Sequence, residues 1–177
     1  RGPPRTTFLD DIVQQADASD APDVVLWGLV RLRADAASAA APGLDVRIAS
    51  AALAVGDTAL ALEAQTRLAR SLPPGSEERR RVIADLIRVE SRQGAPGTLR
   101  QRYTGFRTEF PTAPELDELA ALVASGIAGA GEASVALELL GDPTPGPRSM
   151  LERGYLRLSS GESEGGVADL EAALSGL

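Results

Sequence analysis

The chain has 177 residues and carries 18 basic and 25 acidic side chains, a net charge of −7 that disfavours broad nucleic-acid binding. It lacks cysteine, histidine and lysine, which excludes disulfides, thiolate and imidazole metal sites, and catalysis by those side chains. No apolar run reaches the roughly 18 residues that a membrane-spanning helix needs.

Turn signals divide the chain at regular intervals and predict its helices. Tight glycine turns are expected at Gly56, Gly94, Gly131 and Gly161, and proline-rich breaks alternate with them about every 18 residues. Between the breaks, apolar residues recur every three or four positions, as in Leu60–Leu68, which is the helical period. We therefore predict an all-α protein of about ten helices in five antiparallel pairs.

In chain order, residues 1–5 form a tail and residues 6–41 a first pair that diverges from the others. Four further pairs are expected at 43–75, 76–113, 114–142 and 148–177, with an irregular linker at 141–147. Trp27 lies in the apolar run Val24–Leu32 and is expected in the core. The stepping of Tyr103, Phe106 and Phe110 by three and four residues also predicts core packing rather than base stacking.

Residues around several turns resemble the tetratricopeptide repeat, a helical-hairpin repeat. Its pattern has a small residue in the first helix, a Gly-Asp-type turn, an early alanine in the second helix and a closing proline; Ala49, Gly56, Ala61 and Pro73 match it. Gly94 and Pro111 match in the next pair, and Ala124, Gly131 and Ala136 in the third. The last pair matches at Gly154, Gly161 and Ala173, but Gly166 replaces the usual alanine. The resemblance covers about residues 43–177.

This resemblance implies a right-handed superhelical solenoid with a concave groove lined chiefly by the first helix of each pair. One hairpin cannot bury both its faces, so stacked neighbours complete the core. Such a protein is expected to be a non-enzymatic scaffold that captures a peptide or partner protein, without a cofactor or metal.

Charge is strongly segregated in the middle of the chain. Residues 79–107 contain eight arginines and two acids, whereas residues 108–147 contain seven acids and no arginine. The spacing of Arg81, Arg88 and Arg92 predicts one helix face, turned to the groove in the register of the family. These arginines are candidates for binding a carboxylate or phosphate of an acidic partner. The alternative is a solvated face whose arginines pair with acids of neighbouring repeats.

A second candidate contact lies in the last pair. Leu151, Tyr155 and Leu158 step by four and three residues, which places them on one helix face. They are either groove-facing contacts, with Tyr155 and Leu158 binding the partner, or the seam to the preceding pair. No polar capping helix follows, so we expect the chain to continue or another chain to cover this end.

The alternative function is a structural or assembly module, self-associating through its C-terminal end, or an accessory domain of a larger envelope protein. The exclusive use of arginine as the basic residue suggests a GC-rich bacterial genome. The compartment stays open between the cytoplasm and the periplasm or cell envelope.

Overall fold

The computed structural model describes residues 5–34, 42–92, 95–141 and 146–176. The chain divides into two compact units, residues 1–82 and 83–177. The described residues contain ten helices and no strand, as the sequence predicts. The helices are α1 (Arg5–Ala18), α2 (Pro22–Ala34), α3 (Pro42–Ala54), α4 (Thr58–Ser71), α5 (Glu77–Glu90), α6 (Pro96–Glu109), α7 (Leu116–Gly129), α8 (Ala133–Leu140), α9 (Pro147–Ser159) and α10 (Ser163–Ser175).

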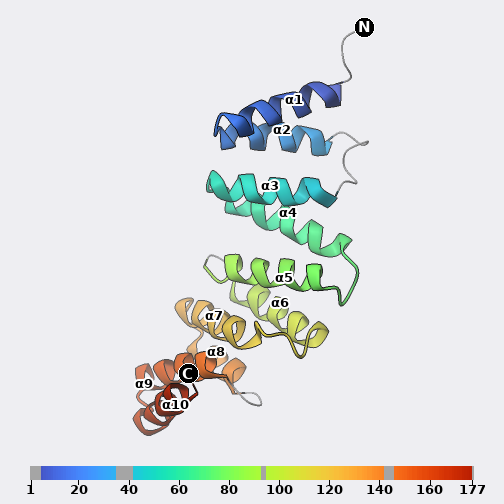
Figure 1. The fold of residues 1–177 in the computed structure, drawn as a ribbon. Helices are drawn as coiled ribbons and strands as arrows, with labels where there is room; N and C mark the ends of the chain where they lie inside the picture. Colours follow the sequence, from blue (N-terminus) through green and yellow to red (C-terminus); the bar gives the residue numbers. More distant parts are fainter. Residues whose placement is uncertain (1–4, 35–41, 93–94, 142–145, 177) are drawn as a thin grey trace. The chain divides into compact units, whose positions relative to one another are not determined.

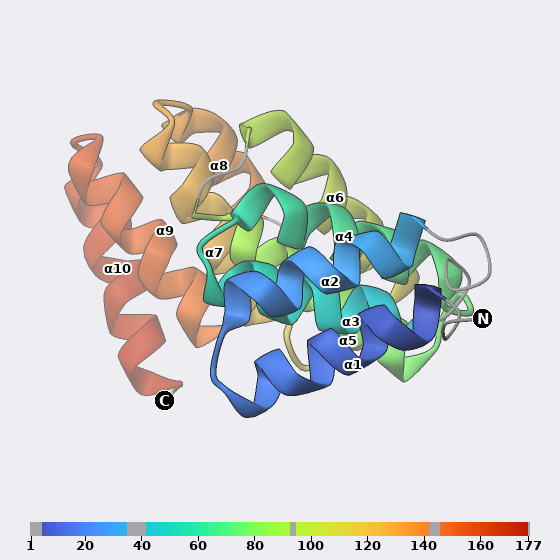
Figure 2. The same ribbon diagram turned by 90° about the horizontal axis from the view of Figure 1, so that it is seen from above.

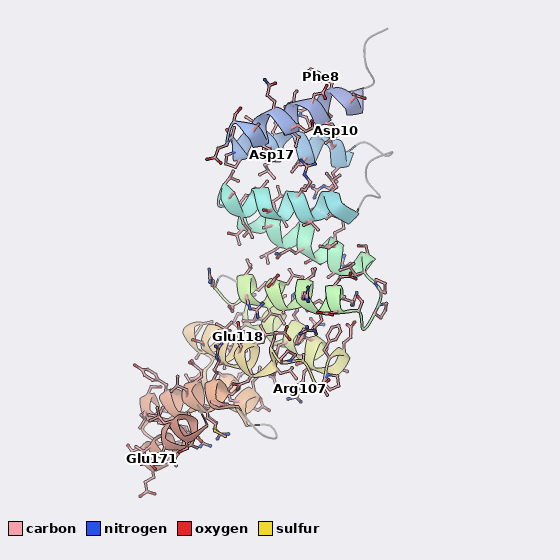
Figure 3. The ribbon with its side chains drawn as sticks, viewed as in Figure 1. Phe8, Asp10, Asp17, Arg107, Glu118 and Glu171 are labelled. Carbon is pink, nitrogen blue, oxygen red and sulfur yellow. The ribbon has the colours of Figure 1, made fainter. Side chains whose placement is uncertain are left out.

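The first unit is built from two helical pairs, α1 with α2 and α3 with α4 (Figure 1). Val13, Leu29 and Ile48 are completely buried and lie in one apolar core contributed by α1 to α4. Gly28 lets α1 and α2 approach closely, because a Cβ added there would lie 2.5 Å from Cγ2 of Val13. Asp17 lies near the end of α1 (labelled in Figure 3) and accepts a hydrogen bond from Arg47 of α3 at 3.2 Å.

The prediction that Trp27 is a core residue is wrong, because 46% of its surface is exposed. Helix α2 is apolar around most of its circumference, so hydrophobicity alone does not identify the buried face. Val25, Leu29 and Leu32, spaced by four and three residues, take the face that packs in the core. Trp27 lies two positions after Val25, about 200° around the helix, and therefore faces solvent.

In the second unit, α7 contacts α6, α8 and α9, and α9 lies beside α10 (Figure 2). Phe106, Leu119, Val123 and Ile127 are among its completely or almost completely buried side chains. The predicted core positions of the three aromatic residues of α6 and its end are confirmed, since Tyr103, Phe106 and Phe110 are at most 8% exposed. The rings of Phe106 and Phe110 contact each other with centroids 5.3 Å apart.

Three of the predicted glycine turns have the backbone conformation that favours glycine. Gly56, Gly131 and Gly161 have φ angles of 79°, 91° and 87°, which L side chains rarely adopt. Asp20 has the same left-handed conformation, with φ 51°, in the turn that joins α1 to α2. The turn expected at Gly94 and most of the linker expected at 141–147 lie outside the described residues.

Candidate functional site

Two ion pairs between successive helical pairs join the basic segment to the acidic segment in the second unit. Arg88 of α5 donates from Nε and Nη2 to the two carboxylate oxygens of Glu118 on α7, at 2.8 and 3.1 Å. Arg100 of α6 pairs with Glu138 of α8 at 3.2 Å. The basic segment thus contacts the acidic segment that follows it, which is the alternative that the sequence offered.

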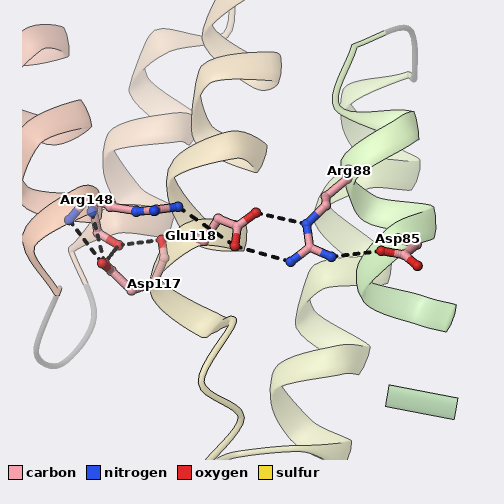
Figure 4. A network of polar contacts seen from close by, with 6 residues as sticks. Asp85, Arg88, Asp117, Glu118 and Arg148 are labelled. Atoms are coloured by element: carbon pink, nitrogen blue, oxygen red, sulfur yellow. Dashed lines mark hydrogen bonds and ion pairs between the residues drawn. The ribbon is translucent and has the colours of Figure 1, made fainter. Parts of the chain in front are cut away.

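The Arg88 pair is the centre of a polar network on the first helices of three successive pairs, α5, α7 and α9 (Figure 4). Arg88 also contacts Asp85 at 2.8 Å, and Arg148 of α9 lies 3.8 Å from Glu118. The hydrogen bond to Glu118 raises the pKa of Arg88 further above its usual range. The same hydrogen bond lowers the pKa of Glu118, so both groups are charged at neutral pH.

Asp117, the neighbour of Glu118, caps the N-terminus of α9 from another helical pair. Its carboxylate accepts hydrogen bonds from the backbone N–H of Arg148 at 3.0 Å and of Ser149 at 2.9 Å, and from the Ser149 hydroxyl (Figure 4). Gly146 leaves room for it, since a Cβ there would lie 2.4 Å from Cγ of Asp117. The carboxylate therefore satisfies donors that the first turn of α9 leaves free.

We expect Asp117→Ala to lower the free energy of unfolding by about 1.5 kcal/mol, because it removes the cap and leaves the backbone N–H of the buried Ser149 without its acceptor. Urea unfolding followed by far-UV circular dichroism measures this loss. Asp85→Ala is the matched control, because Asp85 is an exposed acid of the same network and should cost at most about 0.5 kcal/mol. Equal losses in the two variants would contradict the capping role.

The three predicted arginines do not share one environment. Arg81 is exposed and pairs with Glu77 on the same helix. Helix α5 ends at Glu90, so Arg92 lies in the following turn, and the prediction of one helical face holding all three arginines is wrong. Arg92 is exposed and makes no ion pair with the residues that the structure describes. That any of them contacts a partner stays a prediction.

The predicted apolar contacts on α9 form an exposed stripe. Tyr155 is 71% exposed, and Leu151 and Leu158, one turn to either side, are 46% and 38% exposed. Leu158 also packs over α10, because a Cβ added to Gly166 would lie 2.7 Å from its Cγ. The stripe therefore offers Leu151 and Tyr155 to solvent, while Leu158 is shared between the surface and the α9–α10 contact.

Sequence reasoning missed Asp117 and Ser149, whose contact joins residues 32 positions apart. An acid in the first turn of α7 is indistinguishable in sequence from one that only favours its own helix dipole. Among the described residues, no group of three or more acidic side chains is placed to hold a metal ion. No described helix is long and apolar enough to cross a membrane.

Comparison with known proteins shows the fold. A variant of a protein described as a Podosopora anserina kinesin light chain with nearly identical TPR-like repeats matches with a TM-score of 0.61 and 14% identity, over 97% of this chain and 93% of that one. The form of that protein without the substitution matches with a TM-score of 0.59 and 14% identity, over 97% of this chain and 94% of that one. A structure described as MamA MSR-1 matches with a TM-score of 0.58 and 11% identity, over 97% of this chain and 95% of that one.

No protein-family model and no curated protein sequence matches the chain. The fold class that the sequence predicts is nevertheless confirmed, because the chain is all-α and its solved neighbours are TPR-like repeat structures. It is a TPR-like helical-repeat protein in fold.

Proposed function

We propose that the chain is a non-enzymatic scaffold that binds a segment of a partner protein on the first helices of its repeats. The observation that carries this proposal is the exposed stripe of Leu151 and Tyr155 on α9, beside the ordered network of α5, α7 and α9. Rigid, partly apolar side chains on preformed helices bind with little ordering cost on the scaffold side. The TPR-like fold supports the general role.

The charges near the stripe favour an acidic partner. Arg148 lies in the first turn of the same helix, and 64% of its side chain is exposed, so its guanidinium can donate hydrogen bonds to a second carboxylate besides Glu118. Arg92 and Arg81 remain candidate contacts of a partner in their own right, because both are exposed. Arg88 is the weakest candidate of the arginines, since a partner would have to compete with Glu118 and Asp85.

We expect the double variant Leu151→Ser/Tyr155→Ser to lose a partner that the unaltered chain retains in affinity capture from an extract of the source organism. Leu158 is kept because it packs on Gly166, so its loss would also disturb the fold. The matched control is Leu174→Ser, which removes a 69% exposed apolar side chain from α10 instead. Retention by the double variant would contradict this contact site.

A second candidate function, an assembly module, is favoured by Val167 and Leu174, which are 47% and 69% exposed on α10. Exposed apolar side chains on one helix favour self-association. In this case the mass measured by analytical ultracentrifugation rises with concentration, and Leu174→Ser abolishes the rise. A mass that stays constant would exclude self-association and leave the scaffold proposal untouched.

A further inference from the structure

An apolar cleft of about 510 Å³ lies in the first unit, between α2 and the start of α4. Leu26 and Val30 of α2 form one wall, and Val55 and Leu60 form the other. Trp27 also lines the cleft and is 46% exposed, and Val55 is 38% exposed. Large apolar side chains gathered in a concave surface are typical of binding sites for apolar groups.

Arg31 gives this cleft a charge with no described counter-ion. Its guanidinium carbon lies 4.4 Å from the centre of the Trp27 ring, so the ring holds the guanidinium in place. Arg31 is exposed and makes no ion pair with any residue that the structure describes, whereas Arg33 pairs with Glu63. A guanidinium stacked on an aromatic ring keeps its N–H donors free at its edge, and carboxylates are their best acceptors.

We propose that this cleft binds a protein segment that presents an apolar side chain next to a carboxylate. The apolar side chain lies between Trp27 and Leu60, and the carboxylate accepts hydrogen bonds from Arg31. This surface belongs to the first unit and shares no residue with the α9 stripe, so the inference goes beyond the proposed function. Trp and Arg are also the residue types that contribute most to binding energy at protein interfaces.

The charge at the opposite end of the cleft limits what can bind. Asp23, one turn before Trp27, is exposed in the first turn of α2 and lines the same cleft. It disfavours a second carboxylate near it, so the bound segment has one acid, placed at the Arg31 end. The negative Asp23 and the net charge of −7 also argue against a nucleic acid, although Trp27 and Arg31 could stack on a base.

Selection from a random twelve-residue peptide display library, with the full chain as bait, tests this proposal. We expect enriched peptides to contain an apolar residue within two positions of Asp or Glu. Synthetic copies should change the fluorescence of Trp27, the single tryptophan of the chain. Arg31→Gln should weaken their binding about tenfold or more, because a charge-assisted hydrogen bond is lost.

The matched control is Arg70→Gln, which removes another exposed arginine, from α4 and outside the cleft. It should bind these peptides as the unaltered chain does, and circular dichroism should show both variants folded. The proposal is overturned if no peptide is enriched, if enriched peptides lack the acid, or if both variants bind alike. It is equally overturned if a single-stranded RNA oligonucleotide binds and Arg31→Gln abolishes that binding. Tyr155→Ser leaves this cleft intact. Peptide binding at the cleft and partner binding at the α9 stripe can therefore be lost independently, and the two proposals are tested separately.

Discussion

Replacing Asp169 with asparagine is expected to lower the free energy of unfolding of the α9–α10 pair by about 3 kcal/mol, the low end for breaking a buried ion pair. The Asp169 side chain is 8% exposed and accepts hydrogen bonds from Arg153 at 2.8 and 2.5 Å and from Arg157 at 2.7 Å. Asparagine keeps the shape but removes the charge, so Arg153 loses its counter-ion and Arg157 keeps only Glu162, at 3.7 Å. Arg157 is one-third exposed and water compensates part of its loss.

The same substitution should remove a pH dependence. Hydrogen bonds from Arg153 lower the pKa of Asp169 below its ordinary value. A carboxyl with a lowered pKa in the folded state stabilises that state above its unfolded pKa of about 3.9, and this contribution is lost as the pH falls through the folded pKa. The stability difference between the unaltered chain and Asp169→Asn is therefore full at pH 7 and shrinks below about pH 4.

Hydrogen exchange of the backbone amides of α9 and α10 is the most direct measurement. A loss of 3 kcal/mol means that these helices open about 150-fold more often in the variant, so their amides exchange faster by the same factor. Trp27 lies in the other unit. The substitution should therefore shift the unfolding transition followed by Trp27 fluorescence less than the transition followed by circular dichroism. Glu171→Gln is the matched control, because Glu171 is an exposed acid on the same helix (Figure 3). If both variants exchange alike, the buried ion pairs do not stabilise this helical pair.

The helices could be predicted from the sequence because their signals are local. Glycine at 56, 131 and 161 permits a positive φ, and apolar residues spaced by three and four positions identify the helical pieces between those turns. Trp27 shows the limit of such local signals. On a helix that is apolar around most of its circumference, the sequence does not reveal which apolar residues face the core. The exposure of Trp27 depends on which face of α2 meets α1 and α3.

The candidate site was less predictable, because its contacts join residues distant in sequence. The spacing of Arg88 predicted a face shared with Arg81 and Arg92, but the side chain is partly buried against Glu118, a partner 30 residues away that is chosen by how α5 and α7 stack. The exposure of Tyr155 likewise depends on what packs on α9. Sequence alone left two environments open for this residue, and the structure exposes it.

Gly166 departs from the alanine expected at its repeat position, and the close approach of α9 to α10 explains the departure. A Cβ at Gly166 would meet Cγ of Leu158 at 2.7 Å and the carbonyl oxygen of Gly154 at 3.0 Å. Gly154 is equally confined, since its added Cβ would lie 2.9 Å from the carbonyl oxygen of Gly166 and from Cγ of Leu170. Two glycines opposite each other thus bring two helix backbones together.

Gly154→Ala should therefore destabilise the chain by about 1 to 2 kcal/mol, although alanine favours a helix over glycine by about 1 kcal/mol. The backbone oxygen of Gly166 cannot move aside as a flexible side chain would, so the helices must separate and lose packing. Gly105→Ala on α6 supplies the control of opposite sign, because nothing lies within 4 Å of its added Cβ. At Gly105 only helix propensity changes, so the free energy of unfolding should rise by about 0.5 to 1 kcal/mol. Urea unfolding followed by circular dichroism measures both variants. A stabilising Gly154→Ala would show that α9 and α10 are not held at backbone contact.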